Sequence, residues 1–403
     1  MKSISNLFIK VTSVLKRCPT RLLFIIIAMC EGCVERLDIA QIATSNLPIV
    51  LNGFISDQPG PYHIKISRSF NIGTASSYQA PISVKELVLS DNLGTKETLL
   101  EVTPGNYETS PGGIRGVAGR IYKLNVELLN GKKYESVADT LSAPGNLDTV
   151  YYKFRTFATL KGTKDYYFDI YLDAGNSIAN SYYYLWKFKG TYKVITNPEA
   201  DKEEEPCSYT GIDCAGCSVC NKAQKCTGLR NIAPISSPSP IYFRFKPCDC
   251  CTCWYTIYSE SPVISNYQFL QADGYKNIRV GTILIDNWML QHKIYAEVNQ
   301  LSLTRQGYQF YKAIKDQQEG AASLFQPASG RIPGNIEQKS GSSEPIVGIF
   351  YAASISSKTI IITKQDVPPF TYDFLPEGSP LPPKNCLNLY PNSTNVKPSF
   401  WQD

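Results

Sequence analysis

The chain is poor in histidine and methionine, and it contains none of the common catalytic motifs. Of its 403 residues only two are His and three are Met. His63 and His292 both lie in alternating, strand-like segments, where a structural imidazole is the simpler interpretation. G-x-S-x-G, H-E-x-x-H and glycine-rich phosphate loops are all missing. These absences give no support to an enzyme or to a cofactor, and we interpret the acidic run Asp201–Glu205 as solvated loop and not as a metal site.

Long apolar runs are also missing beyond the N-terminus. Leu22–Met29 is apolar and follows a segment with five Lys and Arg residues, but a bilayer-spanning helix needs about 20 apolar residues. The pattern predicts a signal peptide over residues 1–32. Gly32 precedes Cys33 as a small residue precedes the lipidated cysteine of lipoproteins. We therefore expect Cys33 to be acylated, with palmitate as the expected lipid; the alternative is an ordinary secretory signal that leaves Cys33 free.

The positive charge of the chain belongs mostly to this N-terminal segment. The formal net charge is +5, and residues 1–32 contain five positive residues and one negative residue. The remainder therefore has a net charge of about +1. Such a balance gives no argument for nucleic acid as a partner.

Aromatic residues are abundant, at 12% of the chain with 26 Tyr, which favours β structure. Alternating strands are predicted at Ile49–Ser56 and Tyr62–Phe70, and Arg120–Leu141 is typical of a hairpin with an Asn-Gly turn. We expect an immunoglobulin-like β-sandwich over residues 47–145, preceded by a lipid-anchored tether at 33–46.

A second, larger domain is predicted over residues 146–403. It is rich in Tyr-containing strands and includes one helix near Thr304–Gln317, and a cysteine-rich insertion interrupts it at about 197–253. The apolar face of the helix is formed by residues at helical spacing, Tyr308, Tyr311 and Ile314. The expected fold is thus mainly β.

The cysteines give the strongest chemical pattern. Cys214, Cys217 and Cys220 follow a C-x2-C-x2-C spacing, which also suits zinc or an iron–sulfur cluster. We favour disulfides because an exported chain meets an oxidising compartment, and because an even number of cysteines remains after acylation of Cys33. Adjacent Cys250 and Cys251 should then have different partners. The disulfide candidates are Cys207, Cys214, Cys217, Cys220, Cys226, Cys248, Cys250, Cys251, Cys253 and Cys386.

The order of several sequence blocks is recognisable. These blocks include "GCVERLDI", "GRIYKLNVELLNGKKYES", "SLTRQGYQFYKAI", "IVGIFYAASISSKTIII" and the terminal "STNVKPSFW". Together they resemble Bacteroidota lipoproteins of domain-of-unknown-function family 4249. The resemblance implies an outer-membrane lipoprotein, commonly encoded beside a TonB-dependent receptor, and it implies no catalytic residue. It also implies a second cysteine close to Cys386, which this chain lacks.

We therefore expect a non-enzymatic, lipid-anchored protein of the outer membrane. Its expected role is that of an accessory or substrate-capture partner of a TonB-dependent transporter. The alternative is a structural or adhesive cell-surface lipoprotein that binds glycans or matrix through its aromatic residues. The sequence leaves open the ligand and the face of the membrane on which the protein lies.

Overall fold

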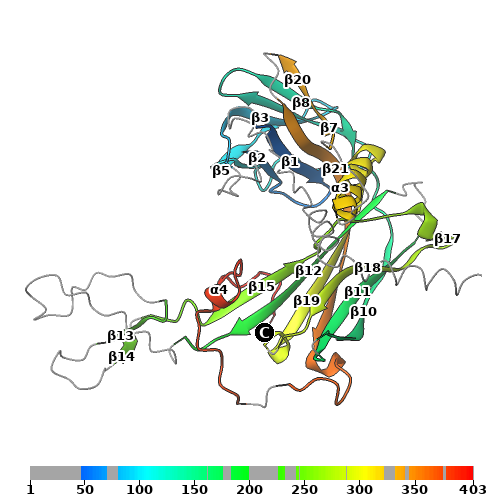
Figure 1. Ribbon diagram of the computed structural model, residues 1–403. Helices are drawn as coiled ribbons and strands as arrows, with labels where there is room; N and C mark the ends of the chain where they lie inside the picture. Colours follow the sequence, from blue (N-terminus) through cyan, green and yellow to red (C-terminus); the bar gives the residue numbers. More distant parts are fainter. Residues whose placement is uncertain are drawn as a thin grey trace, which may run out of the picture. The chain divides into compact units, whose positions relative to one another are not determined.

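The computed structural model describes residues 47–69, 80–160, 162–175, 183–198, 226–231, 242–244, 246–286, 288–321, 332–340, 345–374 and 378–402 (Figure 1). Over these ranges the protein is mainly β with one long helix, which confirms the predicted fold class. The predicted signal peptide, the tether, Cys33 and most of the cysteine-rich insertion lie outside the described residues.

The largest sheet runs through most of the described chain. Its strands are β1 (Ile49–Ser56), β2 (His63–Arg68), β5 (Leu100–Thr103), β6 (Asn106–Glu108), β12 (Tyr184–Ile195), β15 (Thr252–Tyr258), β16 (Val263–Ile264), β19 (Lys293–Ser302) and β21 (Ile346–Thr363). Their order is β15-β12-β19-β21-β1-β2-β6-β5, and β16 pairs with β12 beside this path. β21 pairs parallel with β1 and antiparallel with β19.

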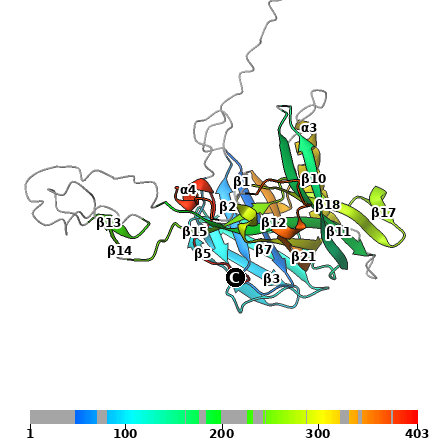
Figure 2. The same ribbon diagram turned by 90° about the horizontal axis from the view of Figure 1, so that it is seen from below.

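Three further sheets are described. One contains β3 (Val84–Asp91), β4 (Lys96–Thr98), β7 (Ile121–Leu128), β8 (Lys133–Ser136), β9 (Asp139–Thr140) and β20 (Ile336–Ser340). Another contains β10 (Leu147–Ala158), β11 (Lys164–Gly175), β17 (Leu270–Gln271) and β18 (Gly274–Leu284), of which β10, β11 and β18 lie side by side (Figure 2). The last is the pair β13 (Leu229–Asn231) and β14 (Tyr242–Arg244).

The described helical segments are short apart from one. They are η2 (Tyr267–Phe269), η3 (Met289–Gln291), α3 (Arg305–Ala321), η4 (Lys364–Asp366) and α4 (Cys386–Leu389).

The first core lies between β1, β2, β6 and β21 on one side and β3, β7 and β8 on the other. Alternation along β7 turns Leu124 and Val126 inward, where they join Leu51 of β1 and Phe350 of β21. β7 and β8 form the predicted hairpin, and Gly131 in its turn has a φ of +81° that favours glycine. The immunoglobulin-like arrangement of this part stays a prediction.

The second core lies between β10, β11 and β18 on one side and β12 and β19 on the other. It contains large aromatic side chains, among them the fully buried Phe168 and Trp186. Ile362, near the end of β21, also belongs to it. β21 therefore contributes to both cores, and residues 47–145 share their core with a strand from the far end of the chain.

α3 confirms the helix predicted near Thr304–Gln317. The Thr304 hydroxyl accepts a hydrogen bond from the Gly307 backbone N–H at 3.3 Å, so it satisfies a donor of the first turn. Tyr308 and Tyr311 pack on the face of the large sheet that includes Leu301 and Tyr351. The Tyr311 hydroxyl donates to that of Tyr351 at 3.0 Å. The helix thus covers part of one face of the large sheet.

A buried carboxylate joins the start of this helix to β21. Asp139 is only 3% exposed, and it accepts hydrogen bonds from the Thr304 hydroxyl at 2.6 Å and from the Ala352 backbone N–H at 2.8 Å. Burial raises the pKa of the Asp139 carboxyl. The side chain fixes α3 and β21 to β9 at one point.

We predict that Asp139→Ala lowers the free energy of unfolding by about 2–3 kcal/mol, because a buried backbone N–H is left without its acceptor. The matched control is Asp273→Ala, since the Asp273 side chain is 71% exposed, and it should change stability by less than about 0.5 kcal/mol. Urea denaturation of both variants checks this. Equal losses in the two variants would show that the Asp139 contacts do not matter to stability.

Candidate functional site

Six of the ten cysteines proposed for disulfides lie in the described residues, and all six are paired. The pairs are Cys226–Cys250, Cys248–Cys251 and Cys253–Cys386. Adjacent Cys250 and Cys251 thus have different partners. Cys207, Cys214, Cys217 and Cys220, which include the C-x2-C-x2-C spacing, lie outside the described residues.

These disulfides brace the edge of the large sheet. β15 is its terminal strand, and the C-terminal segment lies against it: Trp254 and Thr394 exchange backbone hydrogen bonds at 2.8 and 3.0 Å. The Cys386 N–H also donates to the Cys250 carbonyl at 3.0 Å. Because an open edge strand can pair with other chains, this cover protects the sheet. The described cysteines therefore have a structural role.

The described histidines do not form a reactive site. The His63 side chain is 72% exposed and lies 3.0 Å from the Glu108 carboxylate on the neighbouring strand. His292 follows η3 at the point where β19 begins. Neither position suggests general acid–base chemistry, and the structural interpretation of both residues stays a prediction.

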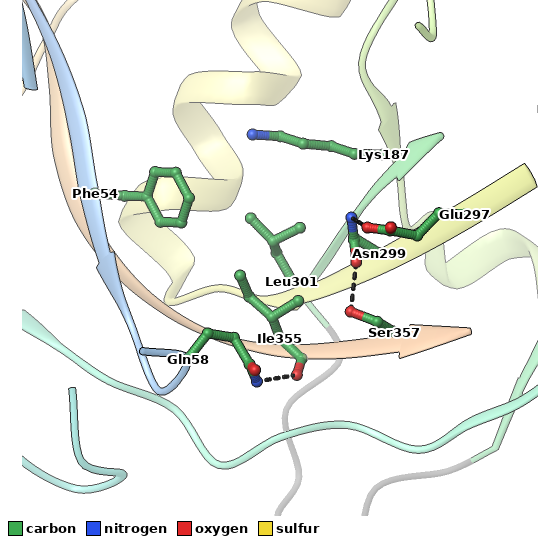
Figure 3. Close-up of a pocket in the computed structure, with 8 residues that line it drawn as sticks. All are labelled: Phe54, Gln58, Lys187, Glu297, Asn299, Leu301, Ile355 and Ser357. Atoms are coloured by element: carbon green, nitrogen blue, oxygen red, sulfur yellow. Dashed lines mark hydrogen bonds between the residues drawn. The ribbon is translucent and has the colours of Figure 1, made fainter. Parts of the chain in front are cut away.

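A pocket of about 270 Å³ lies on the open part of the sheet face that α3 partly covers (Figure 3). Its floor is a cross-strand row in which Lys187 of β12 is opposite Asn299 of β19, and Asn299 is opposite Ser357 of β21. Residues directly opposite each other in a sheet point to the same face, so the register alone gathers these three side chains. The remaining lining residues are Phe54, Gln58, Glu297, Leu301 and Ile355.

Lys187 is the distinctive group of the pocket. It is partly buried, and burial lowers the pKa of its ammonium. Its nitrogen lies 5.3 Å from the centre of the Phe54 ring, and Figure 3 shows the side chain extending toward that ring and away from Glu297. In the described part of the chain no carboxylate lies within ion-pairing distance of this ammonium. Among the described residues, the group found over this charge is the face of the Phe54 ring.

The one carboxylate that lines the pocket is already neutralised. Glu297 forms an ion pair with Lys189 at 3.0 Å and accepts a hydrogen bond from the Asn299 amide at 2.7 Å. The Ser357 hydroxyl donates to the side-chain amide oxygen of Asn299. The polar groups therefore hold one another in fixed orientations, and within the described chain the Ser357 hydroxyl donates to an amide oxygen and not to a base. The arrangement suits binding better than catalysis.

The wall of the pocket is apolar and rigid. The Phe54 ring stacks on Tyr351, with centroids 5.2 Å apart and planes 12° apart, and Tyr351 is fully buried under α3. The Gln58 amide donates to the Ile355 carbonyl at 3.1 Å, which closes the side opposite Lys187. A ligand would thus meet a preformed surface, because the side chains are fixed by packing and hydrogen bonds.

Reasoning from the sequence did not single out any of these lining residues. A weak signal was present in "YLWKFKG", where Lys187 and Lys189 alternate with the buried Trp186 and Phe188. Two lysines on one face of a strand are ordinary, however. What distinguishes Lys187 from Lys189 is the lack of a carboxylate opposite it, and that depends on the register of three strands.

Two of the disulfides differ widely in the length of chain that they close, and this allows a comparison of their contributions to stability. The Cys253–Cys386 pair closes a sequence separation of 133 residues, whereas Cys248–Cys251 closes one of 3. We predict that Cys253→Ala/Cys386→Ala lowers the free energy of unfolding by about 5 kcal/mol, and that Cys248→Ala/Cys251→Ala lowers it by about 2 kcal/mol. A disulfide that closes a longer loop removes more entropy from the unfolded chain, so its loss destabilises the fold more. Denaturation without reductant measures both. A greater loss in the short-loop variant would contradict this ordering.

The desolvated ammonium suggests a second comparison. We predict that Lys187→Met raises the free energy of unfolding at neutral pH by about 0.5–2 kcal/mol, as is common where a binding site holds an unfavourable group. Because the native pKa of Lys187 is lowered from 10.5, the native state releases this proton first as the pH rises. The parent chain therefore loses the cost of its buried charge as the pH rises from the native pKa toward 10.5. Over this range the difference in free energy of unfolding between Lys187→Met and the parent should shrink.

The control for this comparison is Lys189→Met, which removes an ammonium that has a carboxylate partner. It should leave stability unchanged or lower it slightly, by about 0–1 kcal/mol. Urea denaturation at neutral and alkaline pH separates the two variants. If Lys187→Met destabilised the fold as much as or more than Lys189→Met, the ammonium would not be a strained group.

None of the helices in the part of the chain that the structure describes has the length and apolar character needed to span a bilayer. Comparison with known protein families found a match to the model of a domain of unknown function (DUF4249), which covers residues 38–359. No curated protein and no solved structure matches the chain. Because the matched region is most of the sequence and contains every lining residue of the pocket, the chain belongs to this family of unknown function.

Proposed function

We propose that this protein is a non-enzymatic lipoprotein of the outer membrane that captures a small ligand for a TonB-dependent transporter. The observation that supports capture is the pocket at Lys187, where a desolvated ammonium faces an open cavity without a carboxylate partner among the described residues. Its polar groups are oriented by one another, and among the described lining residues no nucleophile is paired with a base. This is an arrangement for holding a ligand.

The transporter partner is supported by a different line of reasoning. The sequence resembles lipoproteins that are commonly encoded beside TonB-dependent receptors, and "GCVERLDI" suits acylation at Cys33. A lipid at Cys33 would keep the chain in the plane of the membrane, and this raises its effective concentration beside a receptor in the same membrane. Weak binding of a ligand would then suffice for delivery.

The adhesive alternative has less support from the aromatic strands. Tyr151 and Tyr171 stack on each other at 5.7 Å, and the Lys153 ammonium lies 4.6 Å from the centre of the Tyr171 ring. A ring whose face is covered by a lysine is not available to stack on a sugar. Capture of a small ligand is therefore the better supported function.

We predict that the affinity-tagged chain, purified from detergent-solubilised outer membranes of cells that produce it, brings a TonB-dependent receptor with it in stoichiometric amount. Cys33→Ala should abolish membrane retention and receptor recovery, because it removes the acylated residue. Cys30→Ala is the matched control, since Cys30 lies in the segment that would be removed, and it should change neither. The proposal fails if no such receptor co-purifies with the acylated protein.

A further inference from the structure

The pocket has a net positive charge because only one of its two ionised lining residues is neutralised. Glu297 is paired with Lys189 at 3.0 Å, so their charges cancel. Lys187 contributes one positive charge that no described carboxylate offsets. In a partly enclosed site a single uncompensated cation is felt strongly by a bound group, since solvent screens it less. The electrostatics of the cavity therefore select an anion.

The rest of the lining limits what that anion can be. Beside the ammonium lie Phe54, Leu301 and Ile355, which offer aromatic and aliphatic surface. The cavity of about 270 Å³ is slightly below the usual range for ligand sites, about 300–1,000 Å³. A ligand that fills it has a compact apolar part and room for one charged head.

We propose that this pocket binds a small organic anion, whose charged head contacts Lys187 and whose apolar or aromatic body packs against Phe54. The inference rests on the proposed capture function, because it names the class of ligand for the same site. Carboxylates and phosphate monoesters share this chemistry of an anionic head on an apolar body.

The hydrogen-bond donors of the pocket fit an anionic head. The Lys187 ammonium has three N–H groups, and its only described contact is with the Phe54 ring. The Asn299 amide has two N–H groups, of which one donates to Glu297. Since Lys187 and Asn299 are opposite each other in the sheet register, their side chains lie on the same face of the sheet. An oxyanion beside the ammonium would receive charge-assisted hydrogen bonds from Lys187.

Contact with the Phe54 ring does not replace an anionic partner for Lys187. A cation above an aromatic face gains about 0.5–2 kcal/mol, which is less than the penalty for taking an ammonium out of water. Burial accordingly lowers the pKa of Lys187. A bound anion would restore the missing charge partner, so ligand binding and the protonated lysine support each other.

The experiment measures the binding of three probes of matched shape to the purified chain by calorimetry and by ligand-observed NMR. Benzoate and phenyl phosphate carry the anionic head, and benzamide is the neutral counterpart of benzoate. We expect saturable binding of at least one anion, and at least tenfold weaker binding of benzamide. The tighter of the two anions then identifies the head group as carboxylate or phosphate.

Variants place the binding at this pocket. Lys187→Met should weaken binding of the anion at least tenfold, and Lys187→Arg should restore much of it because the charge is kept. The matched control is Lys65→Met: Lys65 is an exposed residue of β2 in the same sheet, outside the pocket, and its loss should leave affinity unchanged. Thermal melts of each variant confirm folding, so a lost signal is not an unfolded protein.

Several results would overturn the proposal. These are equal affinities for benzoate and benzamide, undiminished binding to Lys187→Met, equal losses in Lys187→Met and Lys65→Met, or no saturable binding of either anion. The assay contains no receptor, so its failure leaves the transporter partnership standing. Conversely, failure to recover a receptor from membranes leaves the anion pocket standing, and the two proposals are tested separately.

Discussion

The pairing of β21 with β1 on one side and β19 on the other is the constraint on which the rest of the structure depends. The first half of β21 supplies Phe350 and Ala352 to one core, and its end supplies Ile362 to the other. The same register places Ser357 opposite Asn299 and stacks Phe54 of β1 on Tyr351. Without this strand the first core would lose a wall, and the pocket would lose its floor.

The pocket shows how a stable scaffold can hold one unfavourable group. The row beneath it is well satisfied: Glu297 has a lysine and an amide, and Asn299 bonds on both sides. Lys187 differs because its ammonium is desolvated without a carboxylate among the described residues. Rigid surroundings can retain such a group at a cost in stability, and a binding role gives a physical reason for keeping it.

Local features of the fold could be predicted from the sequence, and long-range ones could not. The alternation of "IVLNGFIS" gives the bounds of β1, and Asn-Gly marks the hairpin at Gly131. The spacing of Tyr308 and Tyr311 gives the buried face of α3. Each of these patterns extends over about ten residues, and over that length side-chain periodicity is sufficient to predict the element.

The pocket and the disulfide partners could not be predicted from such local patterns. Lys187 is opposite Asn299 only because strands more than a hundred residues apart in sequence adopt one register, and a shift of one residue would move it to the other face. Likewise the partner of Cys386 is Cys253 on β15, not a cysteine nearby in the chain. Cysteine count and export predicted disulfides in general, but the choice of partner depends on which strand lies at the sheet edge.

The most direct test of the anion pocket is a crystal structure of the protein grown with para-bromobenzoate. Bromine scatters anomalously, so its position is independent of any interpretation of weak density. The account predicts a bromine peak beside Phe54, with the carboxylate within hydrogen-bond distance of the Lys187 nitrogen. A saturated crystal with only solvent in the pocket, or with a carboxylate of the chain itself bound to Lys187, would contradict it.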